Sequence, residues 1–258
     1  MLKLSNLKMQ FGGVVAVDKL DLVVHEGEIV GLIGPNGAGK TTVFNMVTGV
    51  YLPTEGQMTL ETKEGELCLN GRRADQICRD GICRTFQNIR LYKSMTVFDN
   101  VLLGRHQKQK SGWLRAIFRI PPYLESERAD RKISENLLRK LDLWEQRDDI
   151  ASSLPYGKQR RLEIARALAT EPRLLLLDEP AAGMNPQETQ DLMAFIRKIR
   201  EEYQLTILLI EHHMDVVMGI CDRIYVLDHG ILIAEGTADE IQNNQRVIEA
   251  YLGVAESC

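Results

Sequence analysis

Residues 34–41 read Gly34-Pro35-Asn36-Gly37-Ala38-Gly39-Lys40-Thr41, which fits the pattern G-x-x-x-x-G-K-[ST] in full. Residues 28–33 before it form an apolar run typical of a strand, and residues 42–50 after it have the apolar spacing of a helix. Glycines let backbone N–H groups converge on phosphate oxygens, and a helix start presents the positive end of its dipole. The stretch predicts a phosphate-binding loop; a glycine-rich structural turn is the alternative.

Two side chains of this loop carry the charge and the hydroxyl that nucleotide binding needs. Lys40 supplies a point charge to the β and γ phosphates, and Thr41 can ligate Mg²⁺. We therefore expect these residues to contact a nucleotide: Gly34, Pro35, Asn36, Gly37, Ala38, Gly39, Lys40, Thr41 and Thr42.

A second apolar run, residues 173–177, ends in Asp178-Glu179-Pro180. Open α/β sheets bind ligands at the carboxyl ends of their strands, and an Asp there can hold Mg²⁺ through water. Glu179 is then the candidate that orients or deprotonates the attacking water. A solvated strand end is the alternative for these two acids.

The C-terminal half predicts a parallel sheet. Residues 205–210 form another unbroken apolar run, closed by Glu211-His212-His213, and residues 188–203 between the two runs have helical periodicity. Such runs are typical of parallel strands covered on both faces, joined by a helical crossover. The chain is expected to fold around a doubly wound α/β core.

Two other regions have different patterns. Residues 2–9 with 14–24, and residues 57–70, alternate as strands of a small antiparallel layer do. Between about residues 88 and 164 strand signals vanish and helical patterns dominate, which predicts a helical lobe inserted into the core.

Composition excludes several classes of protein. The 258 residues carry 32 Lys and Arg against 36 Asp and Glu, so no global positive field favours nucleic acid. The apolar runs are far shorter than the roughly 20 residues of a membrane-spanning helix. The first residues lack a signal-peptide core, so the cytosol is expected. The five cysteines are scattered and odd in number, and we expect reduced, structural thiols.

These motifs resemble those of ATP-binding cassette (ABC) ATPases, over almost the whole chain. The resemblance implies an α/β P-loop NTPase (RecA-like) core with a small antiparallel β layer and an inserted all-helical subdomain. Residues 1–87 and 165–258 would form the nucleotide-binding core, and residues 88–164 the helical subdomain that carries the signature motif. The implied activity is ATP hydrolysis coupled to transport across a membrane, with ATP and Mg²⁺ as cofactors.

The resemblance also implies roles for single residues. Gln87, in Arg84-Thr85-Phe86-Gln87, matches the glutamine that contacts Mg²⁺ and the attacking water. His212 matches the switch histidine at the γ phosphate, and His213 is read as a bystander because no second cluster supports a metal site. Phe11 matches the aromatic residue against the adenine ring, with a core position as the alternative. The implied catalytic residues are Glu179, His212 and Gln87, and the implied metal-contacting residues are Thr41, Gln87 and Asp178.

The segment Leu154-Pro155-Tyr156-Gly157-Lys158-Gln159 resembles the family's signature, which meets the nucleotide of a second subunit in a head-to-tail dimer. Tyr156, Gly157 and Lys158 are the implied contacts. Pro155 stands where Ser is usual and offers neither a hydroxyl nor a backbone N–H, although a proline also favours a helix start. Asn185 likewise stands where Asp is usual in the loop that crosses the dimer interface.

Three segments resemble the ATPase subunits of bacterial high-affinity branched-chain amino-acid importers: residues 84–91 with 95–97, residues 156–157 leading to 178–183, and residues 246–253. This resemblance implies a second ABC ATPase, alike or related, two integral-membrane permease subunits and a periplasmic or extracellular substrate-binding protein. The chain would lie peripherally on the cytoplasmic face of the inner membrane, with no nucleic acid among its partners. The alternatives are an importer of urea or short-chain amides, a lipopolysaccharide-type exporter, a soluble cassette ATPase acting on DNA or ribosomes, and a regulatory subunit with little hydrolysis.

Two segments are candidates for contact with the permease. Residues 88–92 lie where the family receives a short permease helix. Trp113, Leu114, Ile117 and Phe118 form an apolar stripe that we interpret as core of the helical lobe, with contact to the permease or to lipid headgroups as the alternative.

Overall fold

The structure is a computed structural model that describes residues 1–62, 65–106 and 121–252. The chain divides into two compact units, Met1–Arg84 with Arg173–Cys258, and Thr85–Pro172. The strands are β1 Leu2–Phe11, β2 Val14–Val24, β3 Ile29–Ile33, β4 Glu55–Thr62, β5 Gly65–Cys68, β6 Ile82–Arg84, β7 Leu174–Asp178, β8 Thr206–Ile210, β9 Arg223–Asp228 and β10 Ile231–Gly236. The helices are α1 Lys40–Val47, α2 Ala74–Arg79, α3 Val97–Arg105, α5 Pro121–Lys140, α6 Tyr156–Leu168, α7 Pro186–Tyr203, α8 Met214–Ile220, α9 Ala238–Gln242 and α10 Gln245–Leu252, with single 3-10 turns at Trp144–Gln146 and Ala151–Ser153.

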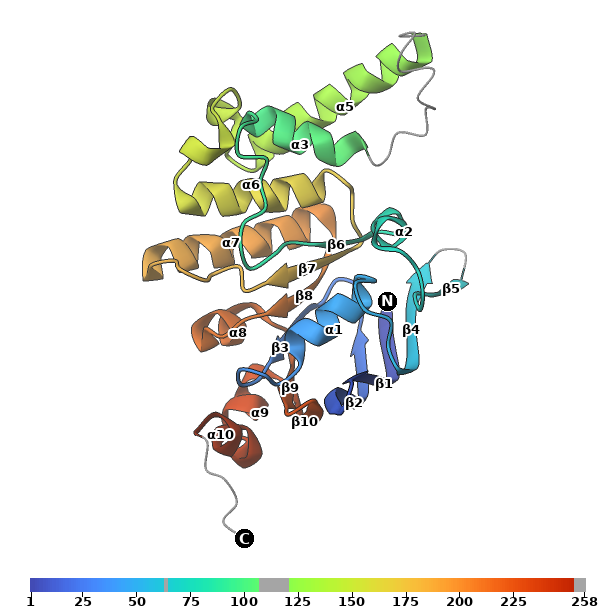
Figure 1. Ribbon diagram of the computed structural model, residues 1–258. Coiled ribbons are helices and arrows are strands. Elements are labelled where there is room, and N and C mark those ends of the chain that lie inside the picture. Colours follow the sequence, from blue (N-terminus) through green and yellow to red (C-terminus); the bar gives the residue numbers. More distant parts are fainter. Residues whose placement is uncertain (63–64, 107–120, 253–258) are drawn as a thin grey trace. The chain divides into compact units, whose positions relative to one another are not determined.

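The first unit is built on a six-stranded sheet with the order β10-β9-β3-β8-β7-β6. Strands β6 to β9 and β3 pair in parallel, and β10 pairs antiparallel with β9 at one edge (Figure 1). All five residues of β3, β7 and β8 are buried, as the unbroken apolar runs predict for strands covered on both faces. The carboxyl ends of these three strands therefore meet at one edge of the sheet.

A second, antiparallel sheet in the same unit has the order β2-β1-β4-β5. Along β1 and β2, buried side chains alternate with more exposed ones. The same alternation in the sequence predicted the small antiparallel layer. The sequence-based expectation of an α/β core with a small antiparallel layer is therefore confirmed.

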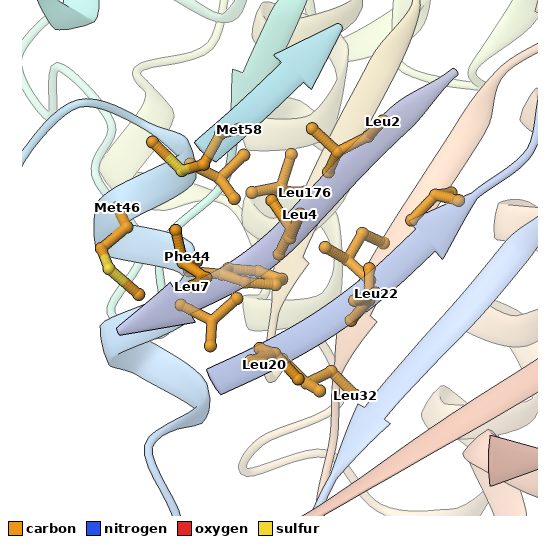
Figure 2. Close-up of a cluster of buried hydrophobic side chains, with 14 of the residues drawn as sticks. Leu2, Leu4, Leu7, Leu20, Leu22, Leu32, Phe44, Met46, Met58 and Leu176 are labelled. Carbon is orange, nitrogen blue, oxygen red and sulfur yellow. The ribbon is translucent and has the colours of Figure 1, made fainter. Parts of the chain in front are cut away.

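Helix α1 packs between the two sheets, and one cluster of buried side chains joins all three elements (Figure 2). The cluster includes Leu4 of β1, Leu22 of β2, Leu32 of β3, Phe44 of α1 and Met58 of β4. Burying a side chain of this size contributes about 1.5–3 kcal/mol. Both ends of the loop between β3 and α1 are thus anchored in the same core.

The other face of the six-stranded sheet carries a smaller cluster. Ile33 at the end of β3, Val217 of α8, Ile241 of α9 and Val247 of α10 pack together with residues of β9. Helix α10 therefore covers the strand that leads directly into the phosphate loop.

The second unit is helical. Its described residues form α3, α5 and α6 and one isolated antiparallel bridge between Thr96 and Ile150. Helices α3 and α6 approach closely at Gly104, where a Cβ would lie 2.5 Å from the carbonyl oxygen of Arg166. Buried Arg105 bonds Asp130 at 3.0 Å and the carbonyl of Ala169 at 2.9 Å, which ties α3 to α5 and to the end of α6.

Sequence patterns missed several short elements. Strand β6 has three residues, too few to show a periodicity, and the β9–β10 hairpin and α8 to α10 were not assigned. The apolar stripe at Trp113, Leu114, Ile117 and Phe118 lies outside the described residues. Among the described residues, no helix is both long enough and apolar enough to span a membrane.

Four of the five cysteines are described, and none of these four forms a disulfide; the sulfurs of Cys78 and Cys83 lie 3.2 Å apart. Cys221 packs its sulfur over the backbone of Gly31, and burial raises the pKa of its thiol to about 12. Because the thiolate is the reactive form, this rise in pKa lowers the reactivity of the Cys221 thiol. We expect iodoacetamide to modify exposed Cys68 quickly and Cys221 only after unfolding, as peptide mapping by mass spectrometry would measure. Equal labelling rates in the folded protein would contradict this.

Candidate active site

At two positions in the loop between β3 and α1, the backbone lies so close to other segments that only glycine fits. A Cβ on Gly34, at φ 146°, would lie 2.0 Å from the carbonyl oxygen of Leu227. A Cβ on Gly39, at φ 99°, would lie 2.5 Å from the carbonyl oxygen of Ala16. The loop is thereby held against β9 and β2, and the first N–H groups of α1 are available to a phosphate because a helix leaves them without intrahelical partners.

Lys40, the first residue of α1, is only 5% exposed. Its Nζ donates to the carbonyl oxygens of Gly34 at 2.6 Å and Pro35 at 2.9 Å. Burial lowers the pKa of Lys40, and the nearby charges of Glu179 first and Asp178 second oppose that shift. The structure therefore brings the phosphate loop and the acidic end of β7 together, although Lys40 and Asp178 are 138 positions apart in the sequence.

Asp178 closes β7 and is buried. Arg84, the last residue of β6, donates from Nη2 to Asp178 Oδ2 at 2.5 Å and from Nη1 to Asn45 Oδ1 of α1 at 2.7 Å. In the sequence, Arg84 stands out only as a neighbour of Gln87. Its partners lie 39 and 94 residues away along the chain, so no local pattern could have identified this contact.

Glu179 and His212 lie side by side. His212 Nε2 is 2.8 Å from Glu179 Oε1, and the backbone N–H of Glu179 donates to the carbonyl of Ile210 at 2.8 Å. Glu179 adopts φ 46°, a left-handed conformation that costs a non-glycine residue about 1–3 kcal/mol and is typical of functional sites. The ends of β7 and β8 thus present a carboxylate and an imidazole as one pair.

The group that sequence reasoning missed here is Glu211, which lies between β8 and His212. Its side chain is fully buried and accepts hydrogen bonds from two different loops. A lone acid directly after an apolar strand was the one available signal. By itself that signal predicts only the end of the strand.

Phe11, at the end of β1, has an exposed fraction of 43%. Its ring meets that of Tyr51 edge to face, with the centroids 5.1 Å apart. Phe11 is therefore not a core residue, and its partly exposed ring is accessible to a ligand.

The remaining predicted residues belong to the second unit. Arg160 of α6 is fully buried and donates to the carbonyl oxygens of Phe86 and Gln87, both at 2.7 Å, and to the hydroxyl of Tyr156 at 3.3 Å. Within this unit, the structure therefore brings Gln87 and the start of the predicted signature helix together. Sequence reasoning missed this arginine because charged residues in helices are most often solvated.

Two departures from the family pattern have structural explanations. Pro155 is the N-cap residue of α6 in extended conformation and its carbonyl accepts the N–H of Gln159 at 2.9 Å. Asn185 caps α7: its side chain accepts the N–H of Glu188 at 3.0 Å, in a reciprocal capping box. Asn185 is a preferred N-cap residue, whereas Pro155 occupies the N-cap position with no side-chain hydrogen bond, one position before the site where proline is favoured.

The donor set suits Mg²⁺ held between protein and nucleotide. Among the described residues, no three His, Cys, Asp or Glu side chains are grouped to hold a metal alone. Mg²⁺ characteristically takes one or two carboxylates together with substrate phosphates, and Asp178 with the Thr41 hydroxyl beside a phosphate loop matches that preference. The residues present therefore fit the ion.

A phosphate loop between β3 and α1, with carboxylates at the end of β7, defines a P-loop protein that binds nucleoside triphosphates. Residues 17–182 match the ABC transporter family model, and residues 232–257 match the model of branched-chain amino acid ATP-binding cassette transporters. The chain belongs to the ABC transporter family and is an ATPase subunit of that family, which binds ATP.

Curated relatives match along the full length. The chain is 48% identical to the high-affinity branched-chain amino acid transport ATP-binding protein LivG of Escherichia coli K12, over 99% of this chain and 98% of that protein. It is 47% identical to BraF of Pseudomonas aeruginosa, which carries the same functional description, over 99% and 98%. The lipopolysaccharide export system ATP-binding protein LptB of Escherichia coli is 34% identical over 96% and 95%.

Solved structures agree with the fold. An ATP-binding cassette of an ABC transporter in its ADP conformation matches with a TM-score of 0.82 and 31% identity, covering 98% of both chains. A dimeric cassette in a post-hydrolysis state with ADP and Pi matches with a TM-score of 0.74 and 27% identity, covering 92% of this chain and 99% of that one. The predicted cassette fold, with its helical subdomain, is therefore confirmed.

Proposed function

We propose that this chain is the ATP-hydrolysing subunit of an importer that takes up leucine, isoleucine and valine. The observation that carries the proposal is the match of the C-terminal residues 232–257 to a model specific for branched-chain amino acid cassettes. Identity of 47–49% over nearly the whole chain to LivG and BraF supports it. The lower identity of 34% to LptB makes a lipopolysaccharide-type exporter the second candidate.

The proposed chemistry uses the residues at the carboxyl ends of β7 and β8. Lys40 would bind the β and γ phosphates, and Glu179 would orient and accept a proton from the attacking water, with His212 holding that carboxylate and contacting the γ phosphate. Thr41 and Asp178 of the first unit would hold Mg²⁺, which would supply positive charge to the transferred phosphoryl group. Because phosphoryl transfer has a loose transition state, these groups act mainly by position and charge.

Assembly would follow the head-to-tail arrangement that the family resemblance implies. Residues 1–87 and 165–258 would serve as the nucleotide-binding core, and residues 88–164 as the helical subdomain. Tyr156, Gly157 and Lys158 would then face the ATP bound by a second ABC ATPase, while Phe11 would stack on the adenine ring of the chain's own ATP.

The proposed complex adds membrane and solute-binding partners. It contains two integral-membrane permease subunits and works with a periplasmic or extracellular binding protein. This chain would lie peripherally on the cytoplasmic face of the inner membrane. The contact with the permease would use residues 88–92, where Arg90 stacks over Phe86 with its guanidinium 3.9 Å from the ring centroid.

Pro155 offers a test of the composite site. Replacing Pro155 with Ser should tighten ATP engagement by about 1–3 kcal/mol, because it adds one hydrogen bond to a charged phosphate. The measurement is KM for ATP in the assembled transporter. Pro155→Ala is the control, since it restores the backbone N–H without the hydroxyl. The same KM and turnover in the Ser variant and the parent would contradict the placement.

The function itself is tested by uptake of labelled leucine in cells whose only copy of the chain is the parent or Glu179→Gln. Uptake that collapses in the variant supports both the catalytic residue and the substrate class. Uptake at the parental rate would remove the branched-chain assignment. The same cells would then be tested with labelled urea and short-chain amides.

A further inference from the structure

Glu211 is a fully buried carboxylate at the carboxyl end of β8, with an exposed fraction of 0%. Burying a carboxylate costs free energy unless hydrogen-bond donors surround it. Three backbone N–H groups donate to Glu211 and the ring nitrogen Nδ1 of His213 lies at hydrogen-bond distance, and none of these four contacts comes from an Arg or Lys side chain. The group is therefore held by backbone N–H groups and one imidazole.

The two carboxylate oxygens serve two different loops. Oε1 accepts the backbone N–H of Ala181, in the loop after Glu179, at 2.8 Å. Oε2 accepts the backbone N–H groups of His212 at 2.8 Å and His213 at 3.1 Å, and lies 3.0 Å from His213 Nδ1. One side chain thus spans from the loop that follows β7 to the loop that follows β8.

The same two loops carry the pair that would act on the attacking water. Glu179 lies two residues before Ala181, and His212 directly follows Glu211; Glu179 Oε1 and His212 Nε2 are 2.8 Å apart. Glu179 also holds a left-handed backbone conformation, which persists only where its surroundings enforce it. Hydrogen bonds from a buried carboxylate to both loops supply such a constraint.

We infer that Glu211 is a positioning residue that clamps the loop after β7 to the loop after β8 and thereby sets the geometry of Glu179 and His212. The inference rests on the proposed function, because it assigns Glu211 to the hydrolytic step. The inference also gives His213 a role. Its Nδ1 lies 3.0 Å from Glu211 Oε2, so this histidine would support the position of Glu211 without contacting the nucleotide.

Glu211→Gln tests the clamp because it keeps the size of the side chain and replaces one acceptor oxygen with a donor. The amide nitrogen would face N–H groups on one of the two loops, and that loop would lose its acceptor. We expect kcat per nucleotide-binding site to fall about tenfold to a hundredfold, as small misplacements of catalytic groups do. KM for ATP should stay within about twofold, because the phosphate loop is built on β3 and α1 instead.

The measurements use the full chain in its assembled transporter. The number of sites that bind nucleotide is determined separately, and kcat is calculated per binding site so that misfolded protein does not lower it. Amide hydrogen exchange is the second readout. It should rise in peptides covering residues 179–185 or 211–214 and stay unchanged in β3. Glu28→Gln is the matched control, since Glu28 accepts the N–H of His25 at 2.9 Å and bonds Arg223 at the opposite end of β3.

An unchanged kcat per site in Glu211→Gln would overturn the inference. A fall in kcat accompanied by faster amide hydrogen exchange throughout the first unit would also overturn it. If Glu211→Gln does not fold, Glu211→Asp takes its place. Its shorter carboxylate reaches only one loop, so a parental kcat in that variant would also overturn the inference. Glu179→Gln is measured in parallel. If Glu179→Gln retains ATP turnover, the proposed hydrolytic site is wrong. If Glu179→Gln loses turnover while Glu211→Gln keeps the parental kcat, only the positioning role of Glu211 is wrong.

Discussion

Glu179→Gln is expected to lower ATP turnover by about a hundredfold to ten-thousandfold, the range that removal of a general base produces. The amide cannot accept the proton of the attacking water, yet it keeps the shape of the side chain. His212 Nε2 can still donate to its remaining oxygen, so the 2.8 Å contact between the two side chains can persist. Nucleotide binding should be retained, because no atom of the phosphate loop changes.

The measurement combines steady-state phosphate release with retention of labelled ATP during gel filtration. The variant should hold ATP where the parent releases ADP. Glu201→Gln, on the exposed side of α7, is the control and should behave as the parent. Turnover near the parental rate in Glu179→Gln would exclude this carboxylate as the base.

Lys40→Ala is expected to weaken ATP binding by about a hundredfold, since contacts to two charged phosphates are each worth about 1.5–3 kcal/mol and do not add fully. A smaller part of the loss would come from the loop itself. Lys40 Nζ bonds the carbonyl oxygens of Gly34 and Pro35, and these contacts disappear with the side chain. The result would be a poorer phosphate site and a less constrained loop.

Equilibrium titration with a fluorescent ATP analogue measures this effect. Lys3→Ala, at an exposed position on β1, controls for the loss of one positive charge. An affinity for Lys40→Ala within about threefold of the parent would contradict the assigned role, since one charged hydrogen bond alone exceeds that difference.

Local patterns predicted the larger elements correctly. Strand β3, helix α1, strands β7 and β8 and helix α7 follow from unbroken apolar runs, helical spacing and a glycine-rich loop, all of which act over a few residues. The same patterns missed β6, which has three residues and is held in the sheet by parallel pairing with β7. Short edge strands depend on their neighbours more than on their own sequence.

For this protein, the sequence alone determined the cassette fold, the phosphate loop and the positions of Lys40, Asp178, Glu179 and His212. Only the tertiary structure decided which polar side chains meet. Arg84 reaches Asp178 across 94 residues of sequence, and Glu211 reaches Ala181 across 30. Apolar periodicity specifies which face of an element is buried, but a buried polar group needs a partner at hydrogen-bond distance and angle, and that geometry exists only once the strands have assembled.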